Sequence, residues 1–227
     1  MSTIERPDLK TPPLKAGQLL DQPTFQIRYS AMPKGTWAEL VAGRVYMPSP
    51  LFDDHGGTGD IVSYWLGHYR RFTPGLRCSS NVSTILKAKN EVQPDHQLRI
   101  RSELGGKARV VEGYVVGPPE LIVEVARSSR NYDLGSKKLD YESAGVMEYI
   151  VVERDPDRFQ WFIRQAGHYE TLNPGRDGLF RSDVFPGLWL NPRALFDEDL
   201  EAIAKGVDLG LATPEHCTFV ELLNRRV

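Results

Sequence analysis

The chain has 227 residues, of which 41% are hydrophobic and 26% are charged. These proportions are typical of an ordinary globular protein and exclude a disordered chain, a collagen-like fibre and a coiled coil. The formal net charge of −2 excludes the overall basic excess that is typical of tight nucleic-acid binders, so such a partner would need a local basic patch.

The apolar runs and the N-terminus predict a cytoplasmic protein without a membrane partner. The longest apolar stretches, such as residues 149–152, are far shorter than the roughly 18 residues that cross a bilayer. Residues 1–10 are polar and lack the apolar centre of a secretory signal. The two cysteines, Cys78 and Cys217, predict reduced thiols rather than a disulfide framework or a zinc site.

The first third of the chain predicts a lead-in, a short strand and a helix. Residues 1–34 contain five prolines and little apolar periodicity, so we expect an extended N-terminal lead-in without a core. Residues 36–46 begin with a helix-like pattern, turn at Gly43 and resume as a short strand. Residues 60–72 place apolar side chains three and four positions apart, which predicts an amphipathic helix that covers a sheet.

The central part of the chain predicts a parallel strand pair. Residues 78–100 indicate two strands joined by a polar turn at 89–91 and interrupted at Pro94. Residues 118–126, a compact apolar run bounded by prolines, predict the next strand. Asp133 can cap a helix over residues 134–144 that ends at Gly145, and a strand over residues 148–152 follows. This order predicts a right-handed crossover between two parallel strands.

The C-terminal third predicts a hairpin and a helical tail. Residues 159–164 and 168–172 pair across Gly167, and residues 183–190 continue in β conformation. The patterns of residues 197–205 and 214–225 predict two short helices. We therefore expect an α/β chain in which residues 35–196 form the main domain and residues 197–227 form a helical tail that packs on it.

Two carboxylates and a lysine are the candidate chemical groups. Asp95 begins a strand after Pro94, and Glu124 lies within an apolar strand, where an ionised carboxylate is costly unless it is paired. The inward stripe of the following helix contains a lysine, Lys137 or Lys138. Such a set suits metal-assisted phosphodiester hydrolysis, because the carboxylates hold the ion and the lysine offsets charge in the transition state. The alternatives are a salt bridge or an edge strand for Glu124 and two surface lysines.

An ordered set of motifs resembles a known family. It comprises Gln93-Pro94-Asp95, residues 118–125, Ser128-Ser129, residues 133–137, Tyr141 and residues 144–152, with flanking matches at residues 37–45, His55 and residues 185–188. This set, spanning residues 25–196, resembles the Uma-type (Uma-two) restriction endonucleases of the PD-(D/E)XK nuclease superfamily. The resemblance implies an α+β fold with a restriction-endonuclease-like mixed β-sheet core flanked by helices.

The resemblance also implies roles for individual residues. Asp95 and Glu124 correspond to the metal-binding carboxylates, with Mg²⁺ or Mn²⁺ as the cofactor, and Lys137 corresponds to the catalytic lysine. The usual strand pattern of the superfamily would place that lysine at position 126, which is Ala126 here. We therefore expect the lysine to have migrated to the helix, with Lys138 as the fallback.

The pattern also suggests roles for two further polar residues, Glu39 and His96. Glu39 matches a helical glutamate that completes the metal site in such nucleases, although an exposed glutamate near a helix end explains it equally well. His96 follows Asp95, so strand alternation points it away from the Asp95 face and predicts a structural role.

We therefore expect a magnesium-dependent endonuclease that acts on DNA. Two copies related by a two-fold axis can cut both strands, which predicts a homodimer with contacts from the hairpin at 159–172 and from Phe219, Leu222 and Leu223. The alternative is a catalytically silent nuclease-fold protein that acts as a binding or assembly module. A small-molecule hydrolase is disfavoured because the chain lacks a Gly-X-Ser-X-Gly motif.

Overall fold

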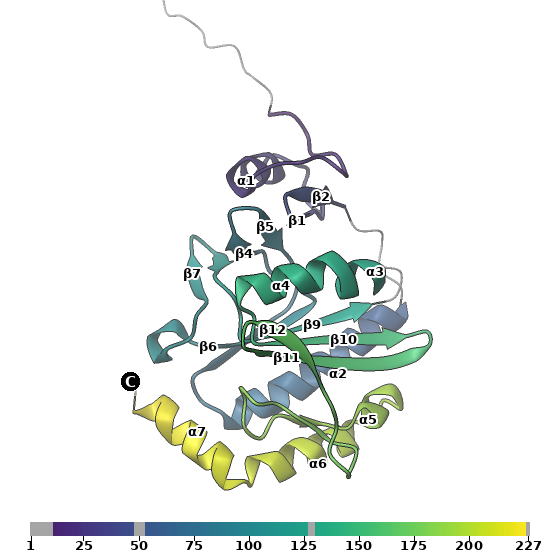
Figure 1. Ribbon diagram of the computed structural model, residues 1–227, viewed down its shortest axis with the longest axis vertical. Coiled ribbons are helices and arrows are strands. Elements are labelled where there is room, and N and C mark those ends of the chain that lie inside the picture. Colours follow the sequence, from purple (N-terminus) through teal and green to yellow (C-terminus); the bar gives the residue numbers. More distant parts are fainter. Residues whose placement is uncertain (1–10, 48–52, 127–129, 226–227) are drawn as a thin grey trace, which may run out of the picture.

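The computed structural model describes residues 11–47, 53–126 and 130–225, and its centre is a six-stranded mixed β-sheet (Figure 1). We name this sheet the main sheet. In spatial order it contains β12 (His168–Leu172), β11 (Asp157–Gln165), β10 (Glu148–Arg154), β9 (Leu121–Ala126), β6 (His96–Ile100) and β3 (Leu76–Ser79). The pair β9 and β10 is parallel and the other neighbours are antiparallel, which confirms the predicted parallel pair.

Helices cover both faces of the main sheet (Figure 1). One face packs against α2 (Asp53–Phe72), which begins seven residues before the predicted start at residue 60. The opposite face is covered by α3 (Arg130–Tyr132), a π-helical turn (Asp133–Lys137) and α4 (Lys138–Ala144). Because both faces are covered, the two central strands are buried throughout most of their length, as expected for parallel strands.

Strand alternation decides which of these helices each side chain of β9 meets. Leu121 and Val123 join the core beneath α2, whereas Ile122 and Ala126 join the core beneath α4. Glu124 has the same parity as Ile122 and Ala126, so it points to the α4 side.

A second six-stranded sheet lies beside the α4 face (Figure 1). In spatial order it contains β2 (Arg44–Tyr46), β1 (Glu39–Val41), β5 (Asn90–Val92), β4 (Thr84–Lys87), β8 (Tyr114–Val116) and β7 (Arg109–Val111). Residues 78–100 therefore form four strands rather than the predicted two. The chain leaves the main sheet after β3, forms the β4 and β5 hairpin here, and returns as β6.

The structure corrects the helical start predicted for residues 36–46. These residues form the β1 and β2 hairpin, in which β1 also pairs with β5. The turn at Ala42 and Gly43 has positive φ at both residues, the geometry that matches the twist of a two-residue hairpin. The predicted turn position is correct, but long-range pairing with β5 overrides the local helical pattern.

The segment predicted to be extended contains a helix and a small core. Helix α1 (Gln22–Ser30) begins where the Asp21 carboxylate accepts a 2.8 Å hydrogen bond from the backbone N–H of Thr24. Phe25 and Leu14 are buried against β1 and β2. The expectation of a lead-in without a core is therefore wrong for this part, and residues 1–10 lie outside the described residues.

The predicted cap at Asp133 is also wrong. The helical segment already includes Arg130–Tyr132, and Asp133 is a buried residue inside it. Gly145 ends α4 with φ 95°, as predicted. Asp133 is therefore a buried carboxylate next to Lys137, one of the predicted site residues.

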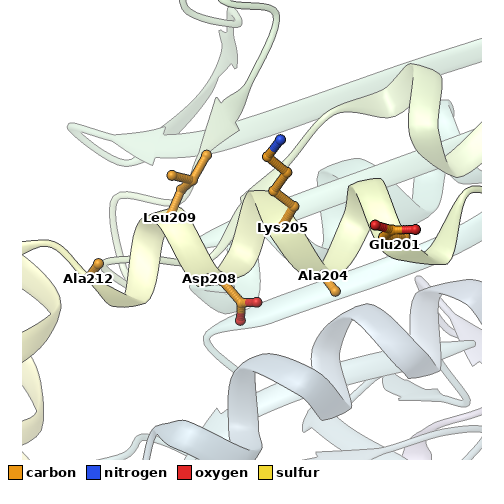
Figure 2. A pocket seen from close by; sticks show the side chains of 6 residues that line it. All are labelled: Glu201, Ala204, Lys205, Asp208, Leu209 and Ala212. Atoms are coloured by element: carbon orange, nitrogen blue, oxygen red, sulfur yellow. The ribbon is translucent and has the colours of Figure 1, made fainter.

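The C-terminal residues pack against α2. A short ladder pairs β13 (Phe180–Arg181) with β14 (Trp189–Leu190), so most of the stretch predicted as β over 183–190 is irregular. It is followed by α5 (Pro192–Phe196), α6 (Leu200–Leu211) and α7 (Pro214–Asn224). Figure 2 shows Asp208 of α6 pointing toward α2, where it lies 2.7 Å from His68 Nε2. Lys205 and Leu209, which line the same shallow surface, point away from α2 (Figure 2).

The same packing corrects the apolar contacts predicted for a homodimer. Phe159 and Phe219 pack against the core on the α2 side, which includes Trp161 and Leu223. Leu222 alone of the three tail residues is substantially exposed, at 48%. Within the described part of the chain, no helix has the length and apolar character needed for a membrane span.

Candidate active site

Four elements bring the predicted site residues together on the α4 face. Glu39 comes from β1, Asp95 directly precedes β6, Glu124 lies in β9, and Lys137 ends the π-helical turn. We name these four residues the acid-lysine cluster. Lys137 Nζ lies 2.9 Å from Glu124 Oε1 and 3.2 Å from Glu39 Oε1. Asp133 adds a further carboxylate oxygen 3.9 Å from the same nitrogen.

The register of the main sheet places Asp95 beside Glu124. His96 pairs with Val123, so the preceding residue, Asp95, lies opposite Glu124. Two backbone hydrogen bonds link the pair. The N–H of Asp95 donates to Glu124 Oε2 at 3.3 Å, and the N–H of Val125 donates to Asp95 Oδ2 at 2.8 Å. The two carboxylates are therefore adjacent.

The π-helical turn determines which lysine faces the carboxylates. Lys137 is 4% exposed and reaches Glu124, and the ring of Tyr132 lies 5.4 Å from its ammonium nitrogen. Lys138 points elsewhere, with Nζ 3.5 Å from the centre of the Phe162 ring. Lys137 thus occupies the position expected for a lysine supplied by the helix instead of by position 126, and Lys138 does not reach the cluster.

Glu39 reaches the cluster from a strand, not from the predicted helix. Its Oε1 accepts a 2.7 Å hydrogen bond from the backbone N–H of Gln93 in addition to the contact with Lys137. Glu39 is 8% exposed, which excludes the alternative of a solvent-exposed glutamate.

Two residues outside the predicted set hold the carboxylates. The Tyr141 hydroxyl donates a 2.7 Å hydrogen bond to Glu124 Oε1, and His55 Nε2 lies 3.3 Å from Asp95 Oδ2. Both residues belong to the motifs that carry the family resemblance. That resemblance was the signal that could have found them, because a lone tyrosine or histidine predicts no such contact.

Lys137 stays protonated in this setting. Burial alone lowers the pKa of Lys137, but the carboxylates of Glu124, Glu39 and Asp133 outweigh it and hold the pKa well above its ordinary value. Burial raises the pKa of Glu124 well above its ordinary value, and the neighbouring acids add to this while Lys137 opposes it. One ammonium group therefore faces an excess of carboxylates.

The pKa of Asp95 shifts in the opposite direction to that of Glu124. Burial alone would raise the pKa of Asp95, but the contacts with His55, Lys137 and the Val125 amide hold the pKa below its ordinary value. Asp95 therefore ionises more readily than Glu124.

His96 lies on the other side of the sheet, in agreement with its predicted structural role. Its Nδ1 is 3.0 Å from Ser80 Oγ and 3.3 Å from Ser63 Oγ of α2. Burial lowers the pKa of His96 to about 4, so the ring is neutral at physiological pH.

The donor set of the cluster suits a hard divalent cation. Within residues 11–47, 53–126 and 130–225, no group of three or more His, Cys, Asp and Glu side chains is arranged to hold a metal. Mg²⁺, however, is commonly bound through one or two carboxylates together with waters and substrate phosphates. The adjacent carboxylates of Asp95 and Glu124 fit that mode, and a bound cation would compensate the excess of buried acids.

The fold is that of a restriction-endonuclease-like protein, and comparisons with known proteins identify the family. The Uma2 family, described as "Putative restriction endonuclease", matches residues 24–193, so the chain belongs to that family. The fold is similar to the crystal structure of a protein described as a putative nuclease belonging to DUF820, from Anabaena variabilis, with a TM-score of 0.60. The two sequences are 14% identical, and the match covers 75% of this chain and 96% of the other. No curated protein matches the chain.

Proposed function

We propose that the protein is a metal-dependent endonuclease that hydrolyses phosphodiester bonds in DNA at the acid-lysine cluster. The observation that carries the proposal is the position of Lys137 Nζ, 2.9 Å from Glu124 and 3.2 Å from Glu39, beside the adjacent carboxylate of Asp95. Membership of the Uma2 family supports the same reaction class.

Asp95 and Glu124 would hold Mg²⁺ or Mn²⁺. The bound ion polarises the phosphate and lowers the pKa of a water molecule. The protein contributes the orientation of both carboxylates, because the Val125 amide and His55 hold Asp95, and the Tyr141 hydroxyl holds Glu124. Such fixed ligands lower the cost of reorganisation during the reaction.

Lys137 would offset negative charge at the reacting phosphate. Its side chain is 5% exposed, so water screens the ammonium charge weakly and its effect on a phosphate is strong. Glu39 acts as a positioning residue, because its carboxylate lies 3.2 Å from the ammonium group and is itself held by the Gln93 amide.

A cleavage assay tests the proposed function. Supercoiled plasmid, linear duplex, single-stranded DNA and RNA would be incubated with the protein and Mg²⁺, Mn²⁺ or EDTA. We expect cleavage of DNA with either metal, none with EDTA, and a loss of at least 100-fold in rate for Glu124→Gln, in line with the loss of a principal catalytic group. Glu170→Gln is the matched control, because Glu170 is an exposed glutamate of β12 outside the cluster.

The outcomes separate the proposal from its alternative. Cleavage that Glu124→Gln retains would assign the activity to another site or to a contaminant. Binding of DNA without cleavage under every metal condition would contradict the proposal and favour a catalytically silent binding module.

A further inference from the structure

Trp37 is a solvent-exposed tryptophan next to the acid-lysine cluster. Its exposed fraction is 44%, whereas Trp65 and Trp161 are fully buried. Trp189 is partly buried, with the guanidinium group of Arg181 4.3 Å from the centre of its ring. An exposed indole ring offers a large, flat apolar surface on which another planar group can stack.

Trp37 lies two residues before Glu39, just ahead of β1, and the alternation of buried core residues in this segment directs it to the side that carries Glu39. Ala38 and Leu40 pack into the small core with Phe25, so the residues between them and on either side point to the opposite face. Glu39 confirms this direction, because it reaches Lys137. Cα atoms two residues apart in a chain are separated by at most about 7 Å, so the backbone of Trp37 lies within about one nucleotide of Glu39.

The neighbouring strand brings Trp37 toward Asp95 as well. Leu40 pairs with Glu91, and the Gln93 side chain donates a 3.3 Å hydrogen bond to the carbonyl oxygen of Ala38. Trp37 precedes Ala38 in the chain and Pro94 follows Gln93, so this hydrogen bond brings the segment of Trp37 close to the segment that leads into Asp95. Trp37 therefore lies at the side of the cluster from which Asp95 enters.

Two other aromatic rings border the same side of the acid-lysine cluster. Tyr46 pairs with Glu39 in the hairpin, and its ring packs against the Tyr132 ring in a tilted arrangement, with ring centres 4.3 Å apart. The Tyr132 ring lies 5.4 Å from Lys137 Nζ. The cluster is thus bordered by aromatic groups, and among them Trp37 is the most exposed.

We propose that Trp37 stacks on an unpaired base of the DNA next to the scissile phosphate, so that the site takes single-stranded or locally unpaired DNA. This inference rests on the proposed function, because the cluster fixes where the phosphate lies. A flat aromatic ring offers sequence-independent stacking to a base, and the stacking strengthens binding by about an order of magnitude. Within an intact duplex both faces of each base are already covered, so the indole gains nothing there.

The test compares single-stranded and duplex DNA of the same sequence without cleavage. Dissociation constants would be measured by fluorescence anisotropy in EDTA and, in a second arm, with Ca²⁺. We expect Trp37→Ala to weaken binding of the single strand about tenfold and to leave duplex binding within twofold. Trp37→Phe keeps a smaller ring and should give an intermediate loss.

A spectroscopic readout and a matched control complete the experiment. Binding of the single strand should quench the tryptophan fluorescence of the wild-type protein, and Trp37→Phe should remove that quenching. Phe72→Ala is the control, because Phe72 is 45% exposed and lies 17 residues along α2 from His55, about 26 Å away. It should leave both binding constants within twofold, and circular dichroism should show all variants folded.

The results distinguish failure of this inference from failure of the proposed function. Equal weakening of single-strand and duplex binding by Trp37→Ala, unchanged binding, or the absence of any quenching would overturn the stacking proposal even if the protein cleaves DNA. Trp37-dependent binding of the single strand without cleavage at any metal would support the stacking site and contradict the nuclease.

Discussion

Lys137 Nζ lies 2.9 Å from Glu124 Oε1, and both side chains are almost completely inaccessible to solvent. Removing one member of such a pair leaves the other charge buried without compensation, which costs far more than the loss of a surface salt bridge. This relationship links the chemistry of the site to the stability of the fold, and it sets the expected behaviour of variants at either residue.

Lys137→Met should abolish cleavage and destabilise the protein. The substitution leaves Glu124, Glu39 and Asp133 without their shared ammonium group, and we expect a loss of about 3 kcal/mol in the free energy of unfolding at pH 8. The loss should shrink at pH 5, because the pKa of Glu124 is raised well above its ordinary value and protonation of this carboxyl group removes its uncompensated charge. Urea unfolding at the two pH values measures both effects. Lys138→Met is the control, and an equal loss for both variants would contradict the assigned pairing.

Tyr141→Phe should reduce both activity and stability. The substitution removes the hydroxyl that holds Glu124 Oε1 at 2.7 Å, which costs about 1.5 kcal/mol for a hydrogen bond to a charged group. Tyr169→Phe is a matched control, because its hydroxyl donates to the carbonyl oxygen of Val146 away from the cluster. Thermal unfolding should show a loss for both variants, and cleavage rates should fall only for Tyr141→Phe. Full activity of Tyr141→Phe would mean that Glu124 needs no such support.

Mg²⁺ should stabilise the wild-type protein against heat. A cation bound by Asp95 and Glu124 favours the folded state by mass action, and at 100 times its dissociation constant the gain is about 2.7 kcal/mol. For a chain of this size the corresponding rise in Tm is about 8 °C. Asp95→Asn should abolish the rise, while Glu170→Gln keeps it. A rise that Asp95→Asn leaves intact would place the cation elsewhere.

Glu148 should make stability pH-dependent away from the cluster. Burial raises the pKa of Glu148 from 4.5 to about 7, although its carboxylate accepts hydrogen bonds from the Ser182 hydroxyl and the backbone N–H groups of Asp183 and Val184. A raised acid pKa favours the folded state at low pH, and this contribution is lost as the pH rises from 4.5 to 7. The free energy of unfolding of the wild type relative to Glu148→Gln should therefore fall by about 3 kcal/mol between pH 4.5 and pH 8. A constant difference would show that the carboxylate titrates at its ordinary pKa.

The protein should form a homodimer, because two copies related by a two-fold axis can cut both strands of a duplex. The apolar side chains of the β11 and β12 hairpin are largely buried within the chain. Of the three tail residues predicted to make dimer contacts, Leu222 is the one that is substantially exposed. Light scattering should give twice the mass of the chain. A monomer mass at all concentrations, with and without DNA, would contradict this prediction, and Leu222→Glu tests the remaining contact.

The sequence alone determined the central fold and the identity of the main charged residues. The strand at 121–126, the following helical segment that ends at Gly145 and the strand at 148–152 follow from local hydrophobic patterns, which act over a few residues. Asp95, Glu124 and Lys137 were predictable because a carboxylate in an apolar strand needs a partner, and the family resemblance supplied that partner.

Tertiary structure decided how the site is completed. Glu39 lies on a strand because β1 pairs with β5, a contact between residues about 50 positions apart that no local pattern contains. Lys137 rather than Lys138 reaches Glu124 because the helical segment already includes Arg130–Tyr132 and passes through a π-helical turn. The contacts of His55 and Tyr141 with the carboxylates likewise depend on how α2 and α4 pack on opposite faces of the main sheet, since packing rather than sequence spacing sets which side chains meet.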